Sequence, residues 1–224
     1  MDRADVTELL EDPSLPEDVV ASAYRDLART QRFLGNTRAV LRLLRRDRAS
    51  IRRVLDIGCG QGALLEQIRQ QLGVEVLGFD LRPAPSAPVQ IVTGNAALDP
   101  LPDADIALAI CVVHHLCDAD VISLIRNVSK SCRRLILLDL VRHWIPLTLF
   151  RAFVSPFLHP INAADGLTSI KRAYTPRELQ NLVDEAVEGS TASVDHRVGP
   201  FYTRQIIDIR FGIIPQSPRP VRSV

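Results

Sequence analysis

Three glycines at alternate positions follow a short apolar run that contains a carboxylate. The run is Val54–Ile57, which includes Asp56, and Gly58, Gly60 and Gly62 come directly after it, before a helical pattern begins. Glycine allows a tight turn and lets a ligand approach the backbone more closely than a Cβ would permit. The free N–H groups at the start of the next helix offer hydrogen bonds and positive potential to an anionic group. The segment therefore predicts a site for a nucleotide-like ligand.

Glycine spacing on its own leaves two cofactor classes open. Gly58, Gly60 and Ala63 also satisfy the dinucleotide pattern GxGxxG/A. However, Asp56 stands at the end of the strand, where a carboxylate suits a ligand with an ammonium group better than a pyrophosphate. The sequence has no Tyr-x-x-x-Lys pair, and it ends in alternating strands rather than in a second mononucleotide-binding half. An NAD(P)-dependent reductase is therefore the alternative interpretation.

The segment DIGCGQG resembles the first motif, DxGxGxG, of class I S-adenosylmethionine (SAM) dependent methyltransferases. The resemblance extends over roughly residues 50–210 as an order of elements. It implies that SAM is the cofactor and that Asp56 lies near its amino group. It also implies that Gly58, Gly60 and Gly62 line the methionine and ribose portions of SAM.

The same resemblance implies further cofactor-binding residues after the next two strands. Asp80 ends the second strand, where the family places an acidic residue on the ribose hydroxyls, and Leu81 would lie against the adenine. Asn95 and Ala96 stand where the family has Asp-Ala after the third strand. Asn95 departs from that pattern, but its amide oxygen can still accept a hydrogen bond from the adenine amino group.

Two adjacent histidines are the candidate catalytic residues. The segment Ile106–Leu116 resembles the fourth strand of the family, including the His-His-Leu ending of small-molecule members such as quinone-biosynthesis methyltransferases. His114 or His115 could take the proton of an acceptor hydroxyl, because an imidazole has a pKa near the working pH. Packing or hydrogen bonding at the strand end is the competing interpretation. The methyl group of SAM is already activated, so the protein mainly supplies alignment and a dry pocket.

The elements that must position these residues alternate between strands and helices. From residue 53 onward, short β-branched runs alternate with helical stretches, which is typical of βαβ units around a parallel sheet. With the resemblance, this predicts an α/β, Rossmann-like class I methyltransferase fold: a mostly parallel seven-stranded sheet with a C-terminal antiparallel strand, plus an N-terminal helical extension. The expected strands are residues 54–57, 74–80, 89–93, 106–112, 135–140, 193–198 and 203–210. The expected helices include residues 63–72 and 119–129 and one that begins at Thr175.

The domain organisation follows from these elements. Residues 1–50 are expected to form the helical extension, as a cap, and residues 51–212 the SAM-binding domain. Residues 213–224 are expected to be a flexible tail. Within the extension, a capping box at residues 14–17 would start the first helix, and Gly35 would end it.

An apolar insertion at residues 143–174 interrupts the alternating pattern. Its first part, Trp144–Leu158, is expected to be buried, either as a core helix or as a cap over an apolar substrate. A polar turn is expected at residues 162–166. The segment falls short of the ~20 residues that a membrane-spanning helix needs, so no transmembrane segment is predicted.

Composition limits the partners. The net charge is +1, and the arginines between Arg38 and Arg53 have no interleaved aromatic residues, so no nucleic-acid partner is expected. The four cysteines form no CxxC pair and no zinc-spaced ladder, which indicates no metal and reduced thiols. The acidic N-terminus has no apolar stretch, so a cytoplasmic location is expected.

These observations predict a methyltransferase that modifies a small apolar acceptor, phenolic, polyketide or quinone-like, on oxygen or carbon. A non-catalytic, methyltransferase-like binding protein is the third interpretation. The sequence does not indicate the oligomeric state.

Overall fold

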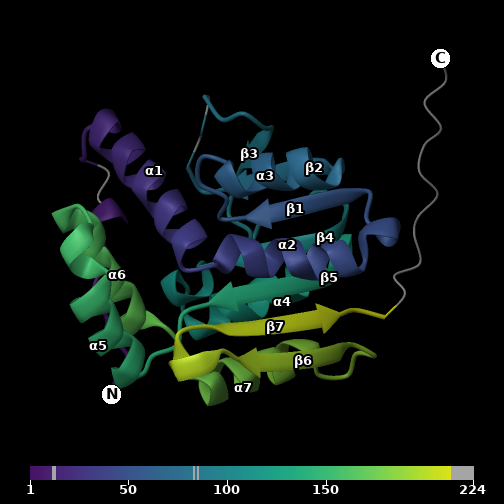
Figure 1. Cartoon of the computed structure of the whole chain (residues 1–224). Helices are drawn as coiled ribbons and strands as arrows, with labels where there is room; N and C mark the ends of the chain where they lie inside the picture. The colour runs from purple at the N-terminus through teal and green to yellow at the C-terminus, as the bar shows by residue number, and fades with distance from the viewer. Residues whose placement is uncertain (12–13, 83, 85, 213–224) are drawn as a thin grey trace.

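A twisted sheet with helices on both faces forms the body of the protein (Figure 1). The computed structural model describes residues 1–11, 14–82, 84 and 86–212. Within these residues seven strands lie in the order β3-β2-β1-β4-β5-β7-β6. The strands are β1 (Arg53–Ile57), β2 (Glu75–Asp80), β3 (Ile91–Thr93), β4 (Ala104–Ile110), β5 (Cys132–Asp139), β6 (Ser193–Val198) and β7 (Gln205–Arg210). β7 pairs antiparallel with both neighbours and the other pairs are parallel, which confirms the predicted sheet.

Seven α-helices are present in the described part of the chain. They are α1 (Glu17–Phe33), α2 (Asn36–Arg46), α3 (Ala63–Leu72), α4 (Asp118–Ser131), α5 (Trp144–Phe153), α6 (Pro160–Arg172) and α7 (Pro176–Val187). The predicted capping box of α7 is present, since the Thr175 side chain and Glu178 cap each other's backbone N–H groups. No helix among the described residues is long and apolar enough to span a membrane.

Alternation along the strands divides the core into two halves. On one face, α2 and α3 bury Leu44 and Ile68 against strand residues such as Ile136. On the other face, α4 and α7 bury residues such as Leu124 and Val183 against the alternate strand positions. Because both faces are covered, the parallel strands are apolar on both sides.

The parallel register brings the ends of β1, β2 and β4 to one edge of the sheet. Ile57 pairs with Phe79 and with Ala109, and the Gly58 N–H donates to the Phe79 carbonyl at 2.8 Å. Residues that follow these strands therefore meet at the carboxyl edge, where open α/β sheets bind ligands. Figure 1 shows α1, α5 and α6 beyond this edge.

Two expectations about local turns are wrong. The first helix begins at Glu17 with Pro16 at its N-cap, rather than with Ser14 at that position. Residues 162–166 lie inside α6 instead of forming a polar turn. The reason is packing: a Cβ on Gly166 would lie 2.2 Å from Cζ of Phe150, so this glycine allows α5 and α6 to approach closely.

The expected burial of Trp144–Leu158 is also wrong. Trp144 is 65% exposed and Phe157 is 84% exposed, and α5 packs mainly on α6 and its own flanking turns. The segment forms an outer helix beside the carboxyl edge of the sheet. The predicted tail, residues 213–224, lies outside the described residues.

The N-terminal segment, residues 1–11, crosses the same edge of the molecule. Its Ala4 N–H donates to the Lys171 carbonyl at 3.1 Å. The N–H groups of Leu9 and Leu10 donate to the two carboxylate oxygens of Asp165, at 2.7 and 3.0 Å. These contacts tie the segment to α6.

Candidate active site

The glycine loop is shaped by backbone conformations that favour glycine. Gly58, Gly60 and Gly62 all have positive φ, at 67°, 53° and 76°. A Cβ on Gly58 would lie 2.5 Å from Cγ2 of Val112, and one on Gly60 would lie 3.0 Å from the Tyr24 ring. Space as well as conformation therefore requires glycine at these two positions.

Asp80 holds this loop and the chain that follows β2. One carboxylate oxygen accepts the Gly60 N–H at 2.8 Å, and the other accepts the Arg82 N–H at 3.0 Å. The carboxylate lines the cavity beside the glycine loop. Each oxygen retains a lone pair for a further donor, such as a sugar hydroxyl.

Asp56 is a buried carboxyl beside a second carboxylate. Its exposure is 3%, and no described residue donates a hydrogen bond to its side chain. Burial, with the charge of Asp80, raises its pKa to about 8. A bound ammonium or sulfonium group would stabilise the ionised form of Asp56. The site therefore suits a cationic ligand, and it fits SAM better than a dinucleotide pyrophosphate.

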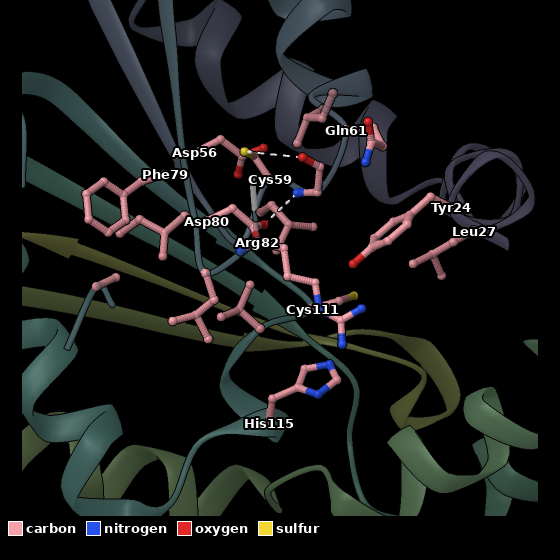
Figure 2. A pocket seen from close by; sticks show the side chains of 18 of the residues that line it. Tyr24, Leu27, Asp56, Cys59, Gln61, Phe79, Asp80, Arg82, Cys111 and His115 are labelled. Carbon is pink, nitrogen blue, oxygen red and sulfur yellow. Dashed lines mark hydrogen bonds between the residues drawn. The ribbon is translucent and has the colours of Figure 1, made fainter. Parts of the chain in front are cut away.

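A single cavity of about 590 Å³ joins the glycine loop to His115, and its size lies within the ~300–1,000 Å³ typical of small-molecule sites. The predicted site residues that line it are Asp56, Gly58, Gly60, Asp80, Leu81, Asn95, Ala96 and His115. Gly62 and His114 are not among the lining residues. Figure 2 shows Asp56 and Asp80 near Cys59, with Tyr24 across from them and His115 farther along.

Asn95 is already engaged in a local turn. Its side-chain oxygen accepts the Ala97 N–H at 2.9 Å, and its own N–H donates to Asp99 at 2.7 Å. An amide oxygen can accept a second hydrogen bond, so this turn is compatible with the predicted contact to an adenine amino group.

The two histidines differ in their surroundings. His114 is 3% exposed, and its Nδ1 lies 2.6 Å from Asp139 Oδ1. Burial lowers the pKa of His114, but the charge and hydrogen bond of Asp139 outweigh burial and leave the pKa raised. His115 is a third exposed in its side chain and lines the cavity. His115 is therefore the histidine that a cavity ligand can reach.

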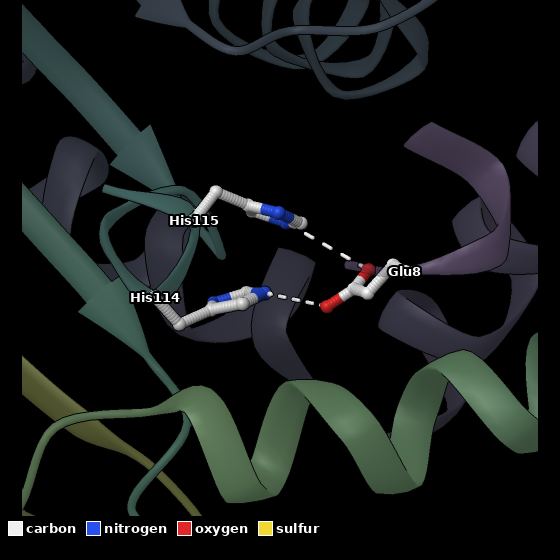
Figure 3. A group of neighbouring side chains, drawn as sticks. All are labelled: Glu8, His114 and His115. Atoms are coloured by element: carbon white, nitrogen blue, oxygen red, sulfur yellow. Dashed lines mark ion pairs between the residues drawn. The ribbon is translucent and has the colours of Figure 1, made fainter. Parts of the chain in front are cut away.

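Glu8 completes this end of the cavity. Its carboxylate lies 3.7 Å from His114 Nε2 and 3.9 Å from His115 Nε2 (Figure 3). The Ser169 hydroxyl donates to Glu8 at 2.6 Å. Burial raises the pKa of Glu8, and this effect exceeds the opposing influence of His114 and Ser169.

Sequence reasoning missed several of these residues. Asp139 gave one usable signal, since it is a carboxyl at the end of the apolar strand β5, at the same edge as Asp80. Tyr24 lies within the predicted first helix, and no pattern there indicates that it packs on Gly60. Nothing in the local pattern around Glu8 points to a distant histidine pair.

Most of this chain matches one protein family in sequence. The sequence profile of a methyltransferase domain family matches residues 28–186. No curated protein matches the chain in sequence.

Among solved structures, human N-acetylserotonin methyltransferase in complex with SAM shares 18% identity at a TM-score of 0.59, over 91% of this chain. The chain spans 62% of that enzyme's length. The plantazolicin methyltransferase BpumL in complex with SAH (S-adenosylhomocysteine) shares 14% identity at a TM-score of 0.66, covering 91% of this chain and 93% of its own. An O-methyltransferase family 2 protein from Planctomyces limnophilus, in complex with apigenin, shares 18% identity at a TM-score of 0.50. The match covers 72% of this chain and 50% of that protein.

At these identities the neighbours establish the fold, and their SAM and SAH complexes agree with the predicted cofactor. The family match covers well over half of the chain. The protein therefore belongs to the methyltransferase domain family.

Proposed function

We propose that this protein is a SAM-dependent methyltransferase that modifies a small, largely apolar hydroxyl compound in the cavity between the glycine loop and His115. The observation that carries the proposal is the cavity itself, which has a carboxylate-rich cofactor end and a histidine end in one continuous space. Neither end would serve methyl transfer without the other.

The cofactor end supplies charge and shape. Asp56 and the glycine loop would hold the amino-acid part of SAM, and Asp80 would accept hydrogen bonds from its ribose. Leu81, Asn95 and Ala96 remain the residues proposed for the adenine. Bound there, SAM supplies an electrophilic methyl group on a sulfonium.

The acceptor end combines apolar walls with one reachable imidazole. Leu10, Leu27 and Leu116 line this cavity with His115. Phe150, Phe153 and Phe157 of the apolar insertion do not line this cavity, so the cavity gives no support to the interpretation of the insertion as a substrate cap. An apolar acceptor is now favoured by the leucines of the N-terminal segment and α1 instead.

His115 is the residue proposed to activate the acceptor. Its imidazole would accept the proton of the acceptor hydroxyl, and the oxygen lone pair would then form the new bond to the methyl group. The pair of electrons of the broken carbon–sulfur bond stays on sulfur. His114, held by Asp139, packs against His115 with ring centroids 4.1 Å apart and fixes its position.

The direct test is calorimetric titration with SAM, SAH and NADH, followed by a screen of hydroxylated aromatic acceptors for SAH release. We expect SAM and SAH to bind and NADH to give no heat. Replacement of His115 by Ala should lower kcat by about 10²–10⁴-fold, the usual contribution of a general base, while the affinity for SAM is unchanged. Binding of NADH but not of SAM would favour the reductase instead.

SAM binding with no turnover of any acceptor would favour the non-catalytic binding protein. The four free thiols fit the cytoplasmic location that we include in this proposal.

A further inference from the structure

Three side chains that can ligate a metal meet where the N-terminal segment crosses the histidine pair. Glu8, His114 and His115 each place a ligand atom within 4.8 Å of the other two. Figure 3 shows both rings turned toward the Glu8 carboxylate, which lies between the N-terminal segment and the turn after β4.

Neither Nε2 atom of the two histidines lies within hydrogen-bonding distance of Glu8. The two Nε2 atoms lie 3.7 and 3.9 Å from the nearer Glu8 oxygens, which is beyond the ~3.2 Å limit of an N–H···O bond. A bridging water would need roughly 4.5 Å between the two atoms that it joins. Ligands at ~2.1 Å from a tetrahedral zinc ion lie about 3.4 Å apart, so the two Glu8–histidine distances are within a few tenths of an ångström of that spacing, and all three ligand atoms lie within 4.8 Å of one another.

The surrounding contacts orient the ligands as they do in metal sites. Asp139 accepts from His114 Nδ1 at 2.6 Å, and also from the Leu140 N–H at 2.7 Å and the His114 N–H at 3.2 Å. As an acceptor of these bonds, Asp139 holds the proton of His114 on Nδ1 and turns Nε2 toward Glu8. A carboxylate–histidine pair of this kind typically stands behind a metal ligand. The Ser169 hydroxyl orients Glu8 in the same way, at 2.6 Å.

Charge is consistent with a divalent cation. The rings of His114 and His115 lie 4.1 Å apart, so two imidazolium charges would repel each other there. A dication between them would face two buried carboxylates, Glu8 and Asp139, while the positive charge of Arg172 also acts on Glu8 and His114.

We propose that Glu8, His114 and His115 bind one Zn²⁺ ion at the acceptor end of the cavity. Two histidines and one glutamate are the ligand set of some catalytic zinc sites, which keep a fourth position open for water or substrate. Glu8 and His115 line the cavity, so the fourth position would face the acceptor. The sequence predicted no metal because its cysteines and histidines lack zinc spacing, and Glu8 lies far from the histidines along the chain.

The chemistry rests on the proposed methyltransferase function and extends it. An acceptor hydroxyl bound to Zn²⁺ would lose its proton to solvent more readily than a free hydroxyl. The resulting oxygen would attack the methyl group, and SAH would leave with the electrons of the broken carbon–sulfur bond. His115 would then act as a ligand, and the metal ion would take over the activation that His115 otherwise performs as a base.

The test uses full-length protein without an affinity tag, stripped with a chelator and dialysed against Zn²⁺. We expect about one equivalent of zinc per chain by elemental analysis. Cobalt substitution should give the visible absorption of a four-coordinate nitrogen and oxygen site, without the sulfur charge-transfer band that binding to a cysteine would give.

Two variants and a matched control locate the site. Glu8→Gln and His115→Asn should each weaken zinc binding by more than the roughly 10–100-fold that loss of an outer-shell partner costs. His159→Asn removes an exposed histidine but preserves an N-cap, so zinc binding should be unchanged. Titration with SAM checks that the variants retain the cofactor end.

Zinc binding that survives both substitutions, or no stoichiometric binding in the wild type, would overturn the proposal. These measurements need neither SAM nor an acceptor. A chain that binds zinc but not SAM would refute the proposed function alone, and a chain that binds SAM but not zinc would refute the metal site alone.

Discussion

The two ends of the cavity are built in different ways. The cofactor end comes from one short stretch of chain, in which the glycine loop and Asp80 are joined by α3 and β2 and by a hydrogen bond from the Gly60 N–H. The acceptor end is assembled from segments far apart in sequence: Glu8 from the N-terminus, His115 after β4 and Ser169 from α6. Local sequence thus specifies the first end, and tertiary packing specifies the second.

The two ends also differ in charge. The cofactor end holds two carboxylates, Asp56 and Asp80, and the charge of Asp80 contributes to the raised pKa of Asp56. At the other end, Glu8 and Asp139 face two imidazoles. The cofactor end therefore favours a positively charged ligand, whereas the acceptor end can accept a proton or bind a divalent cation.

The largest expected effect comes from breaking the shape of the cofactor end. In Gly58→Ala the new Cβ would meet Val112 at 2.5 Å, at a positive φ of 67°. The loop or Val112 must move to relieve this contact, so SAM affinity should fall by about 100-fold or more, which corresponds to the upper end of the roughly 1–3 kcal/mol that overpacking costs. Calorimetric titration of the purified variant measures this.

Gly73→Ala is the matched control. Gly73 also has positive φ, at 59°, but a Cβ there would meet no atom within 4 Å. Both variants should lose ~1–2 kcal/mol of stability through backbone strain at a positive φ. Gly73→Ala should nevertheless leave the SAM affinity unchanged. Equal losses of SAM affinity in the two variants would show that strain, and not the contact with Val112, is responsible.

A smaller effect is expected from neutralising the cofactor end. Asp56→Asn removes the charge that a cationic ligand would meet, so SAM affinity should fall by about 1.5–3 kcal/mol, or roughly 10–100-fold. The wild-type affinity should rise as pH increases toward about 8, because Asp56 ionises in that range, whereas the variant should show no such rise. Titration with SAM at several pH values measures both.

The same variant should become relatively more stable at higher pH. The folded-state pKa of Asp56 is raised to about 8 from 3.8, so between these values folding takes up a proton and the Asp56 contribution to stability falls as pH rises. Asn cannot ionise, so its advantage in melting temperature should grow from about pH 4 to about pH 8, by roughly 2–4 °C per kcal/mol. A constant difference across this range would show that Asp56 titrates normally.

Much of the fold could be predicted because its signals are local. The helix at Ala63–Leu72 and the strand at Ser193–Val198 have the expected bounds, since glycines and alternation mark their ends. The turn expected at residues 162–166 failed because polar residues and Gly166 look like a turn in sequence, although the glycine serves the contact with Phe150. Only the packing of α5 on α6 reveals that role.

The candidate site also contains residues that local sequence predicts and residues that only tertiary contacts bring together. Asp56, Asp80 and the glycine loop follow strand ends, and the register of β1 and β2 places them together. The choice between His114 and His115 depends on Asp139, which no spacing rule links to them. Glu8 is brought in by backbone bonds of Leu9 and Leu10 to Asp165, which are tertiary contacts.

The smallest effect sharpens the comparison by loosening the acceptor end alone. In Asp165→Asn one side-chain position becomes an NH₂ group facing a backbone N–H, so the bonds to Leu9 and Leu10 cannot both form. This should cost about 1–3 kcal/mol of stability, speed amide exchange in residues 3–10 and raise KM for the acceptor a few-fold. The affinity for SAM should change by less than about twofold, because Asp165 touches no residue of the glycine loop and distant sites are usually independent. Hydrogen exchange and separate titrations with SAM and acceptor test this, and an equal loss of SAM affinity would mean that the two ends are one cooperative unit.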